Sequence, residues 1–489
     1  MSNIAHVHSF TTQGINAIPV LVEAHISNGL PKFNIVGLAE SIVKESKERV
    51  RSALLSLNLP FPNKRLTINL APASLPKQGE CFDLPIAISL LIAQGIISQS
   101  KVENLAFCAE LSLAGKLHPI SNATTILLNS KMPIIFADSQ QECSIFKTKQ
   151  TCHLAASLPE VIDFLINSTT LKTPTYTPAK QLKNKAPTII NQPVGEQAIN
   201  IAAVGKHTVR LVGPPGCGKS MLAKSLCGLQ PELTDHEALT AAAIEQAANI
   251  EPTFNKQPRF ISPHHSVTQA GLIGGGSPVR PGAISLAYKG VLFLDEITEI
   301  HRNKLESLRE PLETHSILIA RANQHISFPC DFQLICAMNP CPCGYSTHPS
   351  IDCSCSAHMI KTYQSRLSGP FLDRIAIHLH ITPPTDLNAQ KSLALTKEQV
   401  LAMRQIQLKR QGCLNSQLKL DSPEINKNLD NKARNLFIEL YTENKFSIRK
   451  LLHTKTLART IADIANNEKI LVEHVQQAVF FQGMYLNTT

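Results

Sequence analysis

The sequence predicts an α/β fold, in which a parallel-sheet core lies between an N-terminal α+β domain and a C-terminal helical domain. In residues 188–384 short apolar runs alternate with helical stretches, a pattern typical of a parallel sheet covered by helices on both faces. Residues 1–166 also alternate β-like runs with helical patterns, whereas residues 385–489 carry apolar positions at helical spacing. These patterns predict three domains.

Composition supports this division and limits the class of protein. Residues 167–187 are rich in Thr, Pro and Lys and have no apolar period, so we expect an interdomain linker there. No secretory signal is readable, and the longest apolar stretch, residues 84–97, is too short to cross a bilayer. We therefore expect a cytoplasmic protein with no membrane partner. The net charge of +10 would suit a nucleic acid, although many cytosolic proteins carry such a charge without one.

A phosphate-binding loop is predicted within residues 208–229, TVRLVGPPGCGKSMLAKSLCGL. The pattern Gly213-x-x-x-x-Gly218-Lys219-Ser220 stands between an apolar β-like run and an amphipathic helical stretch, the order that such a loop requires. Backbone N–H groups and the helix start would bind phosphate, Lys219 would reach the β- and γ-phosphates, and Ser220 would ligate Mg²⁺. The expected binding residues are Gly213, Pro214, Pro215, Gly216, Cys217, Gly218, Lys219 and Ser220.

A pair of carboxylates predicts where the same site would hold Mg²⁺ and the attacking water. The segment Gly290-VLFL-Asp295-Glu296 reads as an apolar strand that ends in two acids. Asp295 is the residue type that holds Mg²⁺ beside a phosphate loop, and Glu296 can polarise the attacking water. The alternative is a buried strand that simply meets solvent at an acidic pair, which the preceding phosphate loop disfavours.

The next apolar run, residues 332–338, ends at Asn339. If this run is the strand beside the phosphate-loop strand, Asn339 points between the two and can orient water against the γ-phosphate. A loop asparagine that precedes Pro340 is the alternative. Asn339 is therefore a third expected catalytic side chain, with Lys219 and Glu296.

Four cysteines follow Asn339 in two Cys-x-Cys pairs, within an insertion at residues 341–355. Four thiolates suit a structural zinc ion, although the spacing within each pair is tighter than usual and His348 and His358 are rival ligands. Free thiols and a redox disulfide remain alternatives. The expected zinc ligands are Cys341, Cys343, Cys353 and Cys355.

Beyond these motifs, the chain resembles the ComM/YifB family of magnesium-chelatase-like AAA+ ATPases. The segments GPPGCGKSMLAKSL, PHHSVTQAGLIGGGSPVRPGAISLAYKGVLFLDEITE, LREPLE, AMNPCPCG, SRLSGPFLDRI and LARTIADI look like that family's blocks, in its order. The N-terminal segments NIVGLAESIVKESKERVRSAL and LAPASLPKQGECFDLPIAISLLIAQG are similar too. The resemblance thus covers nearly the whole chain.

The resemblance implies a Lon-protease-like N-terminal domain, an AAA+ core and a helical lid, with six identical chains in a ring and ATP with Mg²⁺ between neighbours. Arg374 would be the arginine finger given to a neighbour, and a surface ion pair with Asp373 is the alternative. Arg449 would be the lid arginine that approaches the nucleotide. The family's usual core-opening motif is reduced here to Gln192, which is the expected residue on the adenine side.

The activity that the resemblance implies is ATP-driven helicase work on DNA, namely branch migration of joint molecules in natural transformation. The Gly-rich insert, residues 271–282, contributes Arg280 and no acid, which would suit a flexible loop on a phosphate backbone or equally a hinge. A remodeller that acts on a protein substrate is the second hypothesis. A protease is the third, but Cys81 stands near the place of the expected nucleophile without a matching lysine, so we expect no proteolysis.

Overall fold

The computed structural model describes residues 4–37, 41–75, 77, 80–145, 151–176, 192–321, 324–384, 394–420, 422–442 and 446–483. Residues 177–187 of the predicted linker and residues 385–393 of the predicted helical domain lie outside the described residues. The chain divides into two compact units: Met1–Gln181 with Thr234–Lys256 form unit 1, and Leu182–Leu233 with Gln257–Thr489 form unit 2. In the described part of the chain, no helix has the length and apolar character needed to cross a membrane.

Unit 1 is built on a seven-stranded mixed sheet with the order β3-β4-β2-β1-β5-β8-β9. Buried and less buried positions alternate along β2, with Val20, Val22 and Ala24 facing the core, as expected for a strand with one covered face. The strands are β1 (Ile4–Gln13), β2 (Asn16–Ser27), β3 (Lys32–Val36), β4 (Arg65–Ala71), β5 (Ala106–Phe107), β8 (Ile134–Ala137) and β9 (Cys152–Ala155), with a separate pair of β6 (Glu110–Leu111) and β7 (Leu117–His118).

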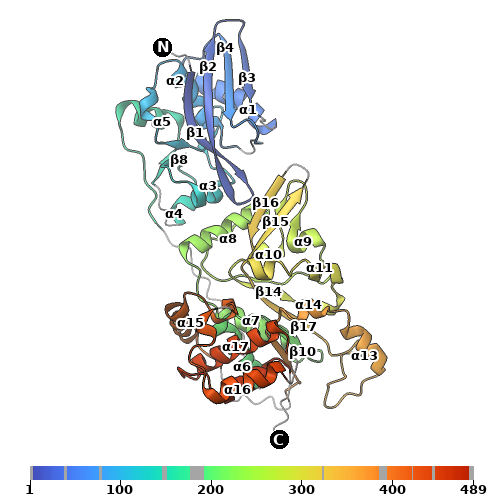
Figure 1. The fold of residues 1–489 in the computed structure, drawn as a ribbon. Helices are drawn as coiled ribbons and strands as arrows, with labels where there is room; N and C mark the ends of the chain where they lie inside the picture. The colour runs from blue at the N-terminus through green and yellow to red at the C-terminus, as the bar shows by residue number, and fades with distance from the viewer. Residues whose placement is uncertain are drawn as a thin grey trace. The chain divides into compact units, whose positions relative to one another are not determined.

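Helices α1, α2, α3 and α5 of unit 1 pack against this sheet (Figure 1). Helix α2 is apolar on all sides and packs on β1 and β2, so the longest apolar stretch of the sequence is a core helix. The helices are α1 (Ser41–Ser56), α2 (Asp83–Ala93), α3 (Ala123–Asn129), α4 (Glu142–Ile145), α5 (Leu158–Asn167) and α8 (Asp235–Ala247).

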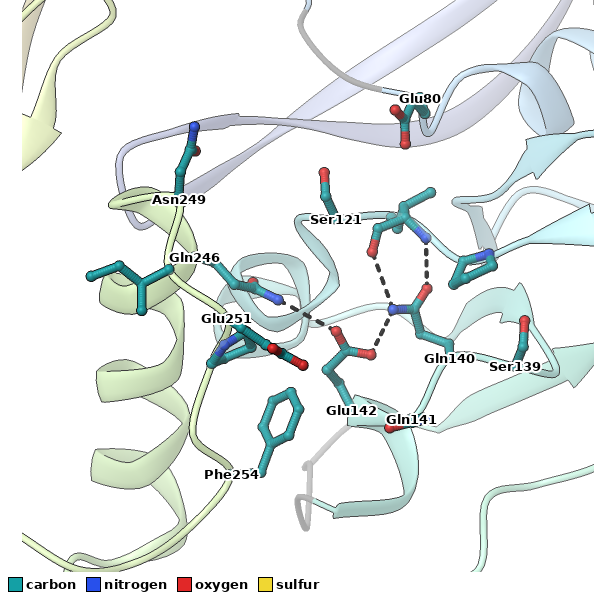
Figure 2. Close-up of a pocket in the computed structure, with 14 residues that line it drawn as sticks. Glu80, Ser121, Ser139, Gln140, Gln141, Glu142, Gln246, Asn249, Glu251 and Phe254 are labelled. Atoms are coloured by element: carbon teal, nitrogen blue, oxygen red, sulfur yellow. Dashed lines mark hydrogen bonds between the residues drawn. The ribbon is translucent and has the colours of Figure 1, made fainter.

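Helix α8 departs from the predicted boundaries, because residues 234–256 were assigned to the core and the structure groups them with unit 1. A capping box between Thr234 and Glu237 starts the helix, whose alanine-rich buried face packs against α3. Figure 2 shows a polar contact between α8 and the start of α4: Gln246 Nε2 donates to Glu142 Oε1 (3.3 Å), and Gln140 Nε2 donates to Glu142 Oε2 (2.6 Å). These residues line a cavity of about 590 Å³ within unit 1.

Unit 2 contains the parallel sheet that the sequence predicts. Its five strands have the order β11-β14-β17-β10-β18, and every neighbouring pair is parallel. All residues of β14 and β17 are buried, which explains why these strands appear in the sequence as continuous apolar runs. The strands are β10 (Val209–Val212), β11 (Phe260–Ile261), β14 (Val291–Leu294), β17 (Gln333–Met338) and β18 (Ile377–His380).

Helices surround this sheet and form most of the C-terminal part of unit 2. Helix α17 packs against α6 and α18, which joins the C-terminal helices to the core. The helices are α6 (Pro193–Gly205), α7 (Lys219–Leu229), α9 (Gln269–Ile273), α10 (Ala283–Leu286), α11 (Arg302–Glu306), α12 (Pro311–Thr314), α13 (Ala357–Gln364), α14 (Gly369–Leu372), α15 (Lys397–Gln411), α16 (Asn431–Thr442), α17 (Ile448–Ile464) and α18 (Val472–Phe481).

Two small antiparallel pairs also belong to unit 2. The Gly-rich insert is more ordered than the expected flexible loop, because α9 leads into β12 (Gly274–Gly275), which pairs with β13 (Arg280–Pro281). A Cβ atom on Gly274, where φ is +108°, would lie 2.8 Å from Arg280 O, so glycine permits this close pairing. The second pair, β15 (Ser316–Arg321) with β16 (Gln324–Pro329), has no counterpart among the elements expected from the sequence.

Candidate functional site

The predicted phosphate loop connects the buried strand β10 to helix α7 at the carboxyl edge of the parallel sheet. Gly216 and Gly218 have φ values of +77° and +92°, a region that L side chains rarely adopt. A Cβ atom on Gly213 would lie 2.5 Å from Ile381 O, so glycine at this position permits the close approach of the segment that follows β18. The loop conformation thus depends on the glycines of the motif.

Lys219 occupies the first position of α7, and its ammonium group turns back over the loop. Its Nζ donates to Gly213 O (2.7 Å), Pro214 O (3.0 Å) and Asn339 Oδ1 (3.2 Å). Burial lowers the pKa of Lys219. A phosphate group in the loop would compete with these three oxygens for the same ammonium group. Ser220 follows in the first turn of α7.

Asn339 is brought to this lysine by the order of the strands. Its strand, β17, lies between β10 and β14, with Val212 opposite Met338 and Leu294 opposite Cys336. This is the neighbour relation on which the prediction for Asn339 depends. The amide follows β17 at the same edge as the phosphate loop, where it can contact a ligand of Lys219.

Asp295 and Glu296 directly follow β14 at the same edge. The carboxylate of Asp295 accepts a hydrogen bond from Glu296 N (2.9 Å), and Glu296 has a φ of +46°, an uncommon value for a residue other than glycine. The turn leaves the Glu296 side chain 54% exposed, 3.3 Å from His265 Nδ1. His265 was not predicted as a site residue, because only the folded chain brings the segment after β11 to β14.

Gln192 lies on the other side of the loop and precedes α6. Its Nε2 donates to Thr382 O (2.8 Å) and Cys217 O (3.4 Å), so it joins the loop to the end of β18. Cys217 itself is buried, and burial raises its thiol pKa. Residues 188–191, which precede Gln192 in the expected adenine-side motif, lie outside the described residues.

The two predicted arginines are not at this edge. Arg374 precedes β18, and its carbonyl accepts a hydrogen bond from Thr208 Oγ1 (3.0 Å), immediately before β10. Arg374 therefore lies at the amino edge of the sheet, across the strands from the phosphate loop.

Arg449, at the start of α17, and Arg374 both form an ion pair with the carboxylate of Glu313. Glu313 Oε1 lies 2.9 Å from Arg374 Nη2 and 2.6 Å from Arg449 Nη2. The ion-pair partner of Arg374 is thus Glu313 rather than the alternative Asp373. The arginines line a cavity of about 540 Å³ at the amino edge. Glu313 was missed because nothing in its local sequence indicates two partners so distant along the chain.

The four cysteines of the insertion converge after Asn339. The Sγ atom of Cys341 lies 3.3 Å from that of Cys343 and 3.7 Å from that of Cys353, and the Cys343–Cys353 distance is 3.5 Å. Two thiolates on a tetrahedral zinc ion lie about 3.8 Å apart. Within the described residues, the sulfur cluster includes Cys355 but neither of the rival ligands His348 and His358.

Backbone donors complete the fit of this cluster to a metal. Cys343 N donates to Cys355 Sγ (3.4 Å), and Ser346 N donates to Cys341 Sγ (3.3 Å). A hydrogen bond from the backbone of Tyr345 lowers the pKa of Cys343, whereas burial and the neighbouring thiols raise the pKa of Cys353 and of Cys355, so the four thiols do not ionise alike without a metal. The sulfur–sulfur distances also exceed the length of a disulfide bond, so the structure contains no disulfide here.

In unit 1, Cys81 is unsuited to nucleophilic chemistry. Its side chain is fully buried, and Sγ donates to Phe10 O (3.2 Å). Burial raises the thiol pKa well above its usual value, which suppresses the reactive thiolate.

Comparison with known proteins agrees with the resemblance seen in the sequence. The family model described as magnesium chelatase, subunit ChlI, matches residues 186–389, and two further models, described as subunit ChlI of Mg-chelatase and as the ChlI C-terminal part, match residues 22–134 and 390–482. The chain is 39% identical to the uncharacterized protein YifB of Escherichia coli over 99% of this chain and 97% of that protein.

Two other relatives differ in their identity to the chain and in how much of it they match. The chain is 38% identical to the competence protein ComM of Haemophilus influenzae, over 99% of this chain and 98% of that protein. The magnesium-chelatase 67 kDa subunit of Chlorobaculum parvum is 23% identical over 42% of this chain and 28% of that subunit. Since the first two matches cover nearly both full lengths, the chain belongs to the ComM/YifB family of magnesium-chelatase-like proteins.

Proposed function

We propose that this protein is a cytoplasmic ATPase that works as a DNA motor, a branch-migration helicase acting on recombination intermediates in natural transformation. The observation that carries the ATPase part is the hydrogen bond between Lys219 Nζ and Asn339 Oδ1. Asp295 and Glu296 directly follow β14 at the same edge of the sheet. The support for the DNA part is the name of the competence protein to which the chain is 38% identical.

Each residue at the carboxyl edge has a role in this proposal. The N–H groups of residues 213–218 bind the phosphates, and Lys219 neutralises the β- and γ-phosphates. Oxygen donors suit Mg²⁺, which Ser220 and Asp295 would hold against the phosphates. Glu296 takes a proton from the attacking water, Asn339 orients that water, and Gln192 lies on the adenine side.

Arg374 and Arg449 act in this proposal on the ATP of a neighbouring chain. Both arginines bind Glu313 at the edge opposite their own phosphate loop, which supports a shared site between subunits. A head-to-tail contact of this kind closes into a ring. We propose a homo-hexamer, in which the helices of residues 394–483 serve as the lid and transmit hydrolysis to the next subunit.

Zinc is the proposed second metal, with a structural role. Four sulfurs leave no open coordination position for a substrate, which is typical of a structural ion. The ion would hold the insertion that follows Asn339, and so the end of β17, in place.

DNA is the proposed substrate, and a protein substrate is the second candidate. A net charge of +10 and the exposed Arg280 of the β12–β13 pair favour contact with a phosphate backbone. The magnesium-chelatase matches favour a remodeller of a protein, because the same type of core occurs in that enzyme's subunits.

The experiment that tests this proposal measures ATP hydrolysis by the purified protein with forked DNA, three-stranded DNA, or no DNA. We expect branched DNA to stimulate hydrolysis, and Glu296→Gln to lower the rate by roughly 10²–10⁴-fold because it removes the base. Glu299→Gln is the matched control, since Glu299 pairs with Arg366 (2.9 Å) outside the proposed site. Hydrolysis that is indifferent to every DNA would favour the protein substrate, and equal loss in both variants would remove Glu296 as the base.

A further inference from the structure

Arg210 lies in the parallel sheet of unit 2 and forms no ion pair with another of the described residues. It lies on β10, with Cys336 of β17 and His378 of β18 as its neighbours in register. Burial lowers the pKa of His378 to about 3 and raises that of Cys336, so both neighbours are neutral near pH 7. Burial lowers the pKa of the Arg210 guanidinium as well. A buried polar atom without a partner is costly, and in the partly exposed Arg210 this applies to Nε.

Two nitrogen atoms at this place have no hydrogen-bond partner among the described residues. They are Arg210 Nε and His378 Nδ1, and both are buried. A buried donor that lacks an acceptor is destabilising. Arg210 Nε is a donor and requires an acceptor in the cavity, whereas Nδ1 of the neutral His378 imidazole is a donor in one tautomer and an acceptor in the other.

The two side chains line the same cavity, of about 240 Å³, between the sheet and the C-terminal helices. Helix α17 contributes Lys450 and His453, and Asp373 is the acid in the lining. Burial lowers the pKa of Lys450, and Asp373 raises it; burial lowers the pKa of His453 to about 4. Near pH 7 the lining therefore carries two cations and one carboxylate, a net positive charge.

The size of the cavity limits its ligand. Pockets for drug-sized molecules have volumes of about 300–1,000 Å³. A cavity of about 240 Å³ is therefore too small for a whole nucleotide, but it can hold a tetrahedral oxyanion with water. Such an anion offers several acceptor oxygens, which matches the donors of Arg210 and Lys450.

We infer that this cavity binds an oxyanion of the size of inorganic phosphate, which joins Arg210 of the sheet to Lys450 of α17. The anion neutralises the partly buried guanidinium and accepts the hydrogen bond from Arg210 Nε that the described residues leave unmade. It thereby fixes the C-terminal helices to the sheet. This site is separate from the phosphate loop and does not depend on the proposed function.

The test measures binding of radiolabelled inorganic phosphate by equilibrium dialysis of the full-length chain. All proteins carry Lys219→Ala, so that the phosphate loop contributes as little as possible. We expect one phosphate per chain in this parent, and Arg210→Met and Lys450→Gln to weaken binding by roughly 10- to 100-fold, the effect of losing a hydrogen bond to a charged group.

Lys455→Gln is the matched control, because Lys455 lies on the same helix and has a similar setting. Its Nζ lies 5.6 Å from the ring centroid of Phe437, as that of Lys450 lies 5.0 Å from Phe446, but Lys455 does not line the cavity. We expect this variant to bind phosphate like the parent. If the parent binds none, water alone fills the cavity and the inference is wrong. Unchanged binding in Lys450→Gln would also overturn it, even if Arg210→Met does not fold.

Discussion

Arg374 should be essential for hydrolysis and should act on the ATP of a neighbouring chain. Thr208, bound to the Arg374 carbonyl, and Gly213 of the phosphate loop are five residue steps apart, with the four residues of β10 between them. At about 3.3 Å per residue, this is about 16 Å, more than an extended arginine side chain spans. Arg374→Ala should therefore leave ATP binding intact and lower the hydrolysis rate by roughly 10³–10⁵-fold, the effect of losing an arginine finger.

Mixing two inactive variants tests the direction of this contact. Lys219→Ala chains lack a working phosphate loop but have the arginine, whereas Arg374→Ala chains have the opposite defect. In equal mixtures, half of the phosphate loops are intact, and half of these meet an intact arginine, so about a quarter of the interfaces in a head-to-tail ring are complete. If the interfaces work independently, the mixture should recover about a quarter of the parent rate.

The controls exclude effects of assembly and charge. Arg434→Ala removes an exposed arginine of α16 and should hydrolyse ATP like the parent. Size-exclusion chromatography should show that the two inactive variants form mixed assemblies. Mixed assemblies without recovered activity at any ratio would refute action between chains. Hydrolysis by Arg374→Ala at the parent rate would refute the finger itself.

Three further predictions follow from neighbouring features. Glu313→Gln should lower kcat more than it raises the KM for ATP, because Glu313 positions the two arginines, and should cause no added loss in an Arg374→Ala background; an additive loss would indicate a separate structural role. Metal analysis should find about one zinc ion per chain, lost in Cys353→Ser and kept in Cys413→Ser, which lies outside the cluster; equal zinc in both variants would exclude the site. Asp331→Asn should lower the free energy of unfolding at pH 7 by at least about 2 kcal/mol, because cationic neighbours hold the pKa of this 13% exposed carboxyl at about 2, below its usual 3.8. That contribution should be complete above about pH 4 and lost as the pH falls through about 2. Denaturant unfolding of both proteins at the two pH values measures it, and a difference in stability between parent and variant that does not change with pH would contradict the reasoning.

The parts of the site that were predictable from sequence are those in which the chemistry is local. The phosphate loop requires glycines, lysine and serine at a fixed spacing between a strand and a helix, so consecutive residues suffice. Asp295 and Glu296 could be predicted because acids at the end of an apolar strand are also a local pattern. The prediction for Asn339 was conditional, because the role of this residue depends on which strands are neighbours. Strand order is a property of the folded sheet.

The contacts that were missed join segments that are distant in sequence. Glu313 binds Arg374 and Arg449, and no local period relates these three positions. His265 reaches Glu296 only because β11 and β14 pair. Helix α8 was predictable as a helix from its capping box, but an alanine-rich face fits many partners, so its packing against α3 could not be read from the sequence.

Strand β10 connects the three features on which the proposals depend. The phosphate loop follows its carboxyl end, and Thr208, bound to the Arg374 carbonyl, precedes its amino end. Arg210 lies between them and faces a cavity that the C-terminal helices help to form. A short, buried strand transmits displacement rather than absorbing it, because its neighbours are closely packed on both sides. An oxyanion at Arg210 would therefore act on a strand that extends between both halves of the proposed ATP site, and it would stiffen the connection between the phosphate loop of one interface and the arginines of the next.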